Sequence, residues 1–342
     1  MIEFFDATLA PILASTLRSA TPLIIAALAG LLCERSGIVN IALEGKMLGA
    51  AFMGFAVSFA SGSPYIGLLA AVAFGLFLAA LHAIATVSLK GDQVVSGVAI
   101  NMLAAGLTAF LYRSLFKNAD SGALQNARAE RFFPINWPGA EAIAEVPLIG
   151  SLYSQVLSGH VFFIYLALLL VPLIWWLLYR SRFGLRLRAC GDAPEAADTT
   201  GVSVVRMRYT AVLLAGLLCG LAGAYLTLSQ AGDFKPNMTA SRGYIALAAL
   251  IFARWRPVAT LFSCLLFGFF TALSDRLQSV SFAEWITDPN AVEQRLLAFA
   301  DAAGSEFFNA LPYALTVVAL ALFAGRAIAP RALGTPYSKE RG

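Results

Sequence analysis

The sequence predicts an all-α protein that crosses a membrane about nine times. Of its 342 residues, 59% are hydrophobic and 13% are charged, whereas roughly 25% charged residues are usual in a soluble domain. The hydrophobic residues form long blocks, and basic residues gather at the edges of these blocks, as in helices that are embedded in a bilayer. We therefore expect one membrane domain over residues 1–342.

Eight of the apolar blocks are long enough to cross a bilayer, because a straight crossing needs roughly 20 residues. A ninth block, 244–253, is about half that length, so we expect a half-helix or a broken span there. The eight long blocks are 9–32, 43–60, 65–89, 93–116, 160–179, 209–230, 257–278 and 308–325.

The charges of the connecting segments orient these blocks. The loop 180–208 carries six arginines, and the positive-inside tendency makes it cytoplasmic. Counting crossings outward from this loop puts the N-terminus and the long connection 117–159 on the extracytoplasmic side. The same count puts the basic C-terminal tail in the cytoplasm.

Two stretches that interrupt the plain spans resemble each other. Residues 36–49 read SGIVNIALEGKMLG and residues 241–256 read SRGYIALAALIFARWR, so each has a small polar turn that leads into an Ile-Ala-Leu run. The expected topology starts them on opposite sides, which favours an inverted structural repeat with a transport pathway at its interface. Chance similarity between two ordinary segments is the alternative.

The cytoplasmic loop contains a predicted short helix. Pro194 suits the first helical position, Glu195 and Asp198 follow in the first turn where the helix dipole favours acids, and Gly201 is a plausible stop. A short exposed helix on this loop is suited to docking a partner. An ordinary solvated loop is the competing interpretation.

This loop resembles the coupling-helix region of permease subunits in ABC importers, whose recurring form is Arg-Ala-x-Gly-x-x-Pro-x-Ala-Ala-x-x-x-Gly. Further stretches agree, namely ERSGIVNIALEG from residue 34, DQVVSGVAIN from residue 92 and MTASRGYIALAALIFARWRP from residue 238. Together they are similar to the nucleoside branch of the nucleoside and simple-sugar permeases. The resemblance identifies a coupling loop at Arg188, Gly191, Asp192, Pro194, Ala196, Ala197, Asp198 and Gly201.

The resemblance implies a multi-pass subunit of the cell inner membrane with the ABC importer permease fold. It also implies an ATPase subunit, a second permease that is homologous or identical, and an extracytoplasmic binding lipoprotein. We expect no catalytic residue, nucleic-acid partner or cofactor in this chain, with ATP and Mg²⁺ held by the ATPase. The residues agree, because Gly45-Lys46 is followed by methionine and lacks the first glycine of a P-loop.

Polar residues at membrane depth are the candidates for the substrate pathway, since they are expensive in lipid and must face protein or water. They are Asn40, Glu44, Gln93, Ser96 and Asn101. Asn40 and Glu44 lie four residues apart and would share one face of a helix. Their amide and carboxylate groups are suited to ribose hydroxyls or base edges.

Four of these five candidates also have a purely structural explanation. Glu44 could pair with Lys46 or Arg35 near the cytoplasmic boundary. Hydrogen bonds between helices could account for Gln93, Ser96 and Asn101.

Three charged residues flank the expected half-helix on its outer side. Asp233, Lys235 and Arg242 could contact the binding protein or the mouth of the pathway, and a plain interfacial charge cluster is the alternative. The four cysteines show no paired spacing and the two histidines are far apart, so we expect neither a disulfide nor a metal site.

Two other classes of function remain open. A permease for simple sugars or branched-chain amino acids would share the coupling loop. A more distant alternative, an ion-coupled secondary transporter, would share the hydropathy but would normally carry several intramembrane carboxylates.

Overall fold

The computed structural model describes residues 9–117, 127–139, 146, 150, 152–279, 314, 318 and 328–338. Within them, seven helices are long and apolar enough to cross a membrane, and one apolar helix is shorter. The predicted all-α membrane fold is therefore confirmed. The count of about nine crossings stays a prediction, because the block 308–325 lies outside the described residues.

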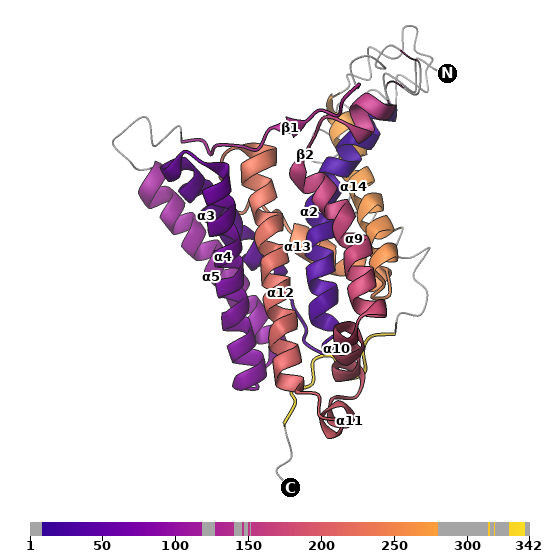
Figure 1. Ribbon diagram of the computed structural model, residues 1–342. Coiled ribbons are helices and arrows are strands. Elements are labelled where there is room, and N and C mark those ends of the chain that lie inside the picture. The colour runs from indigo at the N-terminus through magenta and orange to yellow at the C-terminus, as the bar shows by residue number, and fades with distance from the viewer. Residues whose placement is uncertain are drawn as a thin grey trace, which may run out of the picture. The chain divides into compact units, whose positions relative to one another are not determined.

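The helices follow the apolar blocks closely (Figure 1). Three of the long helices continue into a short π-helical segment, a form in which the hydrogen bonds of the helix widen by one residue. The first half of the chain contains α2 (Ala10–Glu34), α3 (Leu43–Ser61), α4 (Pro64–Ala83) with η2 (Ile84–Ser88), and α5 (Gln93–Tyr112) with η3 (Arg113–Lys117).

Two short strands precede the helices of the second half. Strand β1 (Pro134–Ile135) pairs antiparallel with β2 (His160–Val161), and η4 (Leu152–Leu157) precedes β2. The helices that follow are α9 (Phe162–Arg180), α10 (Arg182–Asp192), α11 (Pro194–Thr199), α12 (Val204–Tyr225) with η5 (Leu226–Ala231), α13 (Arg242–Phe252) and α14 (Pro257–Ser279).

The chain separates into two compact units. One comprises Met1–Ala20, Asn136–Gly159 and Leu265–Arg326, and the other comprises Thr21–Ile135, His160–Cys264 and Ala327–Gly342. Every candidate site residue belongs to the second unit. The expected single membrane domain and the expected sides of loops 117–159 and 180–208 stay predictions.

In the second unit, α12 packs on α4 and α3 with almost no space between the backbones. A Cβ atom added to Gly75 of α4 would lie 2.5 Å from the carbonyl oxygen of Gly216, and one added to Gly223 would lie 2.3 Å from that of Met47. Small residues allow such close approach between membrane helices. As a result, 78% of an 18-residue apolar stretch of α12 and η5 is buried, whereas only 22% of the corresponding stretch of α5 and η3 is buried.

The first unit contains a similar close contact. Gly268 of α14 packs against α2, where an added Cβ would lie 2.7 Å from the Cβ of Ala20 and 2.8 Å from the carbonyl oxygen of Thr16. Between the two strands in the sequence, the backbone N–H of Trp137 donates to the hydroxyl of Ser158 at 2.8 Å.

Loop 180–208 contains the predicted short helix and one that was not predicted. Helix α11 begins at Pro194, and Gly201 follows it with a φ of 83°, as the pattern predicts. The additional helix, α10, is capped by the hydroxyl of Ser181, which accepts from the N–H of Gly184 at 3.0 Å. The predicted half-helix is confirmed as α13, which has 11 residues.

Candidate functional site at two helix N-termini

The similar stretches 36–49 and 241–256 meet in the structure through one carboxylate. Glu44 lies in the first turn of α3. Its Oε1 accepts from the backbone N–H of Ser241 at 2.9 Å, and its Oε2 accepts from that of Gly243 at 2.6 Å. A single side chain of α3 therefore caps the N-terminus of α13.

The local backbone explains why α13 needs this external cap. Ser241, the residue before α13, has a φ of 65° and makes no side-chain capping bond of its own. Asn237 and Ala240 also have positive φ values, which non-glycine residues adopt at a cost. The first N–H groups of a helix need acceptors, and its dipole favours an anion there. Glu44 meets both needs, and it lies at the positive end of α3 as well.

Asn101 joins α5 to the same junction. Its Oδ1 accepts from the N–H of Gly45 at 2.7 Å, and its Nδ2 donates to the carbonyl of Ile41 at 3.0 Å and to the hydroxyl of Tyr244 at 2.8 Å. A Cβ added to Gly45 would lie 2.7 Å from the Cα of Asn101, so the backbones touch here. Three helices are thereby fixed by one amide.

Asn40 lies outside α3, so the prediction that it shares a helical face with Glu44 is wrong. Helix α3 begins only at Leu43, and residues 38–40, which follow the Gly37-containing turn, are in neither a helix nor a strand. The Oδ1 of Asn40 instead accepts from the Nζ of Lys46 at 2.8 Å, and both side chains are fully buried.

Gln93, Ser96 and His82 hold the backbone next to Asn40. The Oε1 of Gln93 accepts from the N–H of Val39 at 2.7 Å. His82 contacts the carbonyl of Val39 through Nε2 at 3.2 Å and the hydroxyl of Ser96 through Nδ1 at 3.0 Å. Because a carbonyl only accepts, Nε2 carries the proton and Nδ1 accepts from Ser96. The predicted hydrogen bonds between helices are therefore present for Ser96 and Asn101, whereas Gln93 binds the loop before α3 instead.

Two amide groups in this region still have capacity to donate. The Nδ2 of Asn40 and the Nε2 of Gln93 are buried and have no hydrogen-bond partner among the described residues. Buried donors of this kind are rare and costly when nothing meets them. A polar ligand could accept a hydrogen bond from either group without displacing a hydrogen bond that already exists.

The suggested pairing of Glu44 with Lys46 or Arg35 is wrong. Lys46 donates to Asn40, and Arg35 donates to the backbone carbonyl of Trp255 through Nη2 at 2.7 Å and Nε at 3.2 Å. Trp255 also donates from its indole N–H to the carboxylate of Glu34 at 2.6 Å. These bonds tie the C-terminal end of α13 to the end of α2.

The charged residues near α13 are only partly brought together. Asp233 and Lys235 form an exposed pair at 4.0 Å, and such pairs contribute little to stability. Arg242 lies one residue from the Glu44 contact and donates to the carbonyl of Met238 at 3.0 Å. Their proposed role at the mouth of the pathway stays a prediction.

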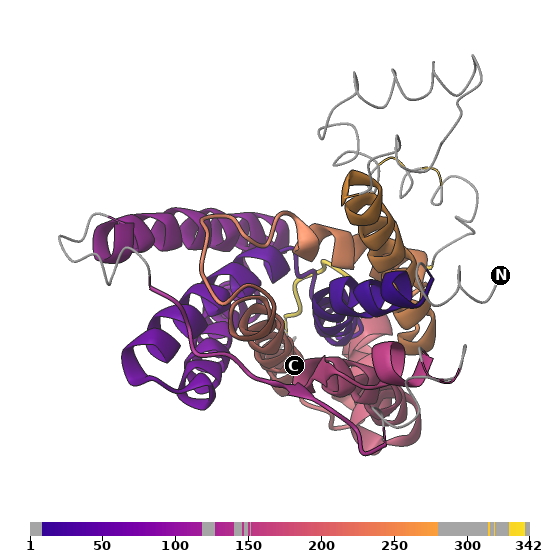
Figure 2. The ribbon, with the colours of Figure 1, turned by 90° about the horizontal axis from the view of Figure 1, so that it is seen from above.

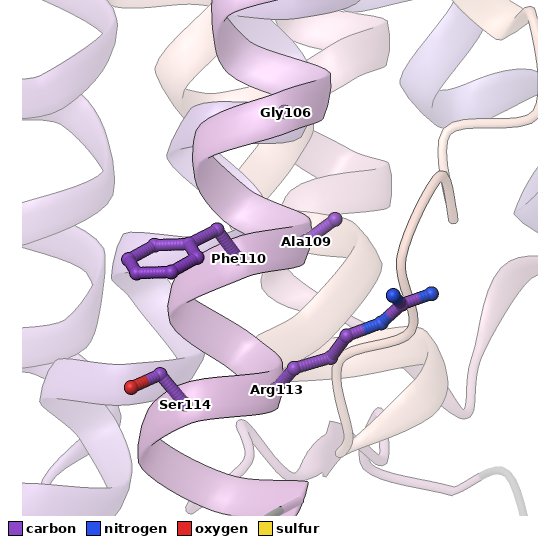
Figure 3. Close-up of a pocket in the computed structure, with 5 residues that line it drawn as sticks. All are labelled: Gly106, Ala109, Phe110, Arg113 and Ser114. Carbon is purple, nitrogen blue, oxygen red and sulfur yellow. The ribbon is translucent and has the colours of Figure 1, made fainter.

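Two open hollows lie away from the buried junction. One, of about 520 Å³, lies on α5 and η3 and is lined by Gly106, Ala109, Phe110, Arg113 and Ser114 (Figure 3). The other, of about 800 Å³, is lined by Arg35, Trp175, Tyr179, Arg188, Arg256, Pro257, Val258, Ala259 and Phe262.

The sequence interpretation missed four residues that hold the junction and the loop before α3. Lys46, His82 and Arg208 are buried polar side chains of α3, α4 and α12, and the hydroxyl of Tyr244 accepts from the Nδ2 of Asn101. The positions of Lys46 and His82 inside apolar blocks were a usable signal, because such groups are expensive in lipid unless a partner meets them.

Comparison with known proteins gives a consistent result. A family model described as the permease component of the branched-chain amino acid transport system matches residues 12–325. The chain is 38% identical to the guanosine ABC transporter permease protein NupQ of Bacillus subtilis, over 96% of this chain and 97% of that protein. It is 35% identical to the nucleoside ABC transporter permease protein NupC of Lactococcus lactis subsp. cremoris, over 98% of both chains.

A third relative has a different printed substrate. The chain is 40% identical to a putative glucose ABC transporter permease protein of Haloferax volcanii, over 82% of this chain and 81% of that protein. No solved structure matches the chain. The similarity to ABC permeases and the seven apolar helices identify a multi-pass inner-membrane protein. The chain belongs to the family of permease components of the branched-chain amino acid transport system.

Proposed function

We propose that the chain is a transmembrane subunit of an ATP-driven ABC importer and forms the translocation pathway for nucleosides. The observation that carries this proposal is the similarity to guanosine and nucleoside permeases over nearly the whole length of each chain. The buried junction of α3, α5 and α13 is the candidate pathway.

The chemistry of the junction suits such a substrate. A nucleoside carries ribose hydroxyls and base nitrogen and oxygen atoms that accept hydrogen bonds. The free amide donors of Asn40 and Gln93 match these acceptors, whereas both carboxylate oxygens of Glu44 already cap α13. Both amides are buried, so access requires movement of the surrounding helices.

The partners follow from the same proposal. An ATPase subunit docks at the coupling loop, with α11 as its contact, and holds ATP and Mg²⁺. A second permease, homologous or identical, completes the pathway, and an extracytoplasmic lipoprotein delivers the substrate. The charged residues Asp233, Lys235 and Arg242 are the proposed contacts near the mouth of the pathway.

Uptake by cells that lack the gene tests the substrate. Cells that express the chain should accumulate labelled guanosine, adenosine, cytidine or uridine, and depletion of ATP should abolish the uptake. A protonophore applied while ATP is maintained should leave the uptake unchanged. Uptake that follows the proton gradient instead would contradict the ABC mechanism.

A sugar importer is the second candidate, because of the 40% identical putative glucose permease. Labelled glucose and ribose are therefore included in the same assay. Restoration of sugar uptake without nucleoside uptake would replace the proposed substrate but leave the transporter class unchanged.

Recovery of an ATPase tests the partner. Ala196 is exposed on α11, so Ala196→Trp should weaken co-purification of the ATPase without disturbing the fold. Ala60, exposed in the last turn of α3, supplies the same substitution as a control, and Ala60→Trp should retain the ATPase. Equal recovery with both variants would count against docking at α11.

A further inference from the structure

The end of the chain lies across the cytoplasmic loop and the loop that precedes α3. Residues 328–338, here called the C-terminal strap, run beside the ends of α10 and α12 (Figures 1 and 2). The N–H of Ala332 donates to the carbonyl of Gly191 in α10 at 2.9 Å, and the N–H of Gly334 donates to the carbonyl of Gly37 at 3.1 Å. One short segment is thus hydrogen-bonded to both loops.

A buried arginine holds the strap in this place. Arg208, in the second turn of α12, is 1% exposed. Its Nη1 donates to the carbonyl of Thr335 at 3.0 Å, and its Nε donates to the carbonyl of Ser36 at 3.3 Å. The same guanidinium therefore binds the strap and the loop before α3. Burying a guanidinium is costly unless it is hydrogen-bonded, and here Nε and Nη1 each find a carbonyl, whereas the buried Nη2 has no hydrogen-bond partner among the described residues.

The backbone segments around Arg208 are closely packed. A Cβ added to Gly191 would lie 2.3 Å from the carbonyl oxygen of Arg35, and one added to Gly37 would lie 2.9 Å from Nη2 of Arg208. Gly37 also has a φ of 92°, which favours glycine. Packed elements without voids move together rather than deform, so a displacement of α10 displaces the loop before α3.

The far end of the strap is attached to α11. Tyr337 packs on a buried cluster formed by Cys190, Ala197 and Val204. Its hydroxyl forms a hydrogen bond with Asp198 of α11, and burial together with this bond raises the pKa of Tyr337. The strap therefore follows α11 if that helix moves.

The loop before α3 leads directly to the candidate pathway. Val39 in this loop binds Gln93 and His82, and the next residue is Asn40, which binds Lys46. A shift of this loop by a fraction of a hydrogen-bond length would weaken these bonds. It would also change the position of the free amide of Asn40.

We infer that the C-terminal strap, with Arg208 as its positioning residue, transmits movement of α11 to the loop that carries Asn40. The inference rests on the proposed function, in which an ATPase docks at α11. It adds a link between that docking site and the pathway which the coupling helix alone does not supply. Arg208 contacts neither substrate nor nucleotide and acts only through the loops that it joins.

The test uses the complex that co-purifies with the chain, reconstituted in vesicles of its native lipids. Arg208→Gln removes the charge and part of the fork, and Arg206→Gln makes the same change at an exposed position of the same helix. Two quantities are measured, namely nucleoside uptake per ATP hydrolysed and amide hydrogen exchange of residues 36–42 with ATP plus vanadate and without nucleotide. We expect Arg208→Gln to lower uptake per ATP about tenfold, which is a typical size for the coupling between two sites.

The nucleotide-dependent change in exchange at residues 36–42 should also disappear in Arg208→Gln and persist in Arg206→Gln. An unchanged exchange response and an unchanged uptake ratio in Arg208→Gln would overturn the inference. A wild-type complex that transports but shows no nucleotide-dependent change at residues 36–42 would also overturn the inference, whereas a wild-type complex without ATP-dependent nucleoside uptake would contradict the proposed function instead. The two failures are therefore distinguishable.

A second variant keeps the test decisive if Arg208→Gln does not fold. Tyr337→Ala releases the far end of the strap from α11, whereas Tyr337→Phe retains the packing on Cys190. In Tyr337→Ala, this release should expose the Cys190 thiol to maleimide and lower uptake per ATP. In Tyr337→Phe, the packing on Cys190 should change little. A folded Tyr337→Ala complex with an exposed Cys190 and full coupling would refute the role of the strap.

Discussion

At the scale of single residues, Glu44 has a role that depends on both of its oxygens. Each oxygen accepts from a different N–H at the N-terminus of α13, namely that of Ser241 at 2.9 Å and that of Gly243 at 2.6 Å. Hydrogen bonds to a charged group are worth more than neutral ones, and a buried N–H without an acceptor is costly. The position of α13 should therefore depend on the carboxylate rather than on the shape of the side chain.

Glu44→Gln tests this dependence with almost no change in volume. The amide nitrogen would face an N–H donor, so one bond is lost and the favourable charge at two helix N-termini disappears. We expect destabilisation by about 2 kcal/mol and a strong loss of uptake. Thermal unfolding of the purified chain measures the first effect. Glu195→Gln, an exposed carboxylate on α11, is the control and should unfold like the wild type.

Cys190 should be chemically silent in the folded protein. It is fully buried, and desolvation raises the pKa of its thiol, although the charge of Arg208 opposes this shift. The thiolate is the reactive form, so a raised pKa keeps the thiol protonated at neutral pH and shifts the onset of reaction to more alkaline pH. Labelling with N-ethylmaleimide at pH 7, followed by mass spectrometry, should leave Cys190 unmodified until the chain is unfolded in dodecyl sulfate. Rapid labelling of the folded protein would contradict the described packing.

At the scale of elements, the contact of α4 with α12 depends on residues without side chains. A Cβ added to Gly216 would lie 2.3 Å from the Cβ of Ala79 and 2.7 Å from the carbonyl oxygen of Gly75. Backbone atoms cannot move aside as a flexible side chain can. Gly216→Val should therefore separate the two helices and destabilise the chain by about 3 kcal/mol.

Gly106 provides the comparison for this prediction. It also lies within a membrane helix, α5, but an added Cβ would meet no atom within 4 Å. Gly106→Val should leave the melting temperature of the purified chain nearly unchanged, while Gly216→Val lowers it. Equal effects would mean that loss of glycine, and not the close approach, determines stability.

The same scale separates what the sequence could predict from what it could not. The long helices and the short α13 follow from the thickness of the bilayer, and Pro194 with Gly201 predicts α11 by local rules. Helix α10 was missed because it is a short basic helix outside the apolar blocks. The helical placement of Asn40 failed because α3 begins only at Leu43, a boundary that no period in the sequence reveals.

At the scale of the whole molecule, the contacts of the site join residues that are distant in sequence. Glu44 binds Ser241 across 197 residues, and Arg208 binds Ser36 across 172. A single sequence predicts that such polar groups need partners, because burial without partners is costly. It does not select the partner, since many polar groups in the chain could satisfy the same need.

The transport mechanism depends on the predicted topology, that is, on the side of the membrane on which each loop lies. The six arginines of loop 180–208 predict a cytoplasmic location by the positive-inside tendency, and an ATPase could reach α11 only from that side. In a chain whose four cysteines are replaced by alanine, Glu195→Cys reports on this loop, because Glu195 is exposed. Lys235→Cys reports on the opposite side, and Lys235 has 77% of its side chain exposed.

Intact spheroplasts treated with a membrane-impermeant maleimide should label Lys235→Cys and spare Glu195→Cys. Permeabilised membranes should label both variants, which shows that each thiol is reactive once the reagent reaches it. The reverse pattern in intact spheroplasts would put the arginine-rich loop outside the cell, where ATP-driven coupling through α11 could not operate. In that case both the proposed docking of an ATPase and the transmission of its movement through the C-terminal strap would have to be abandoned.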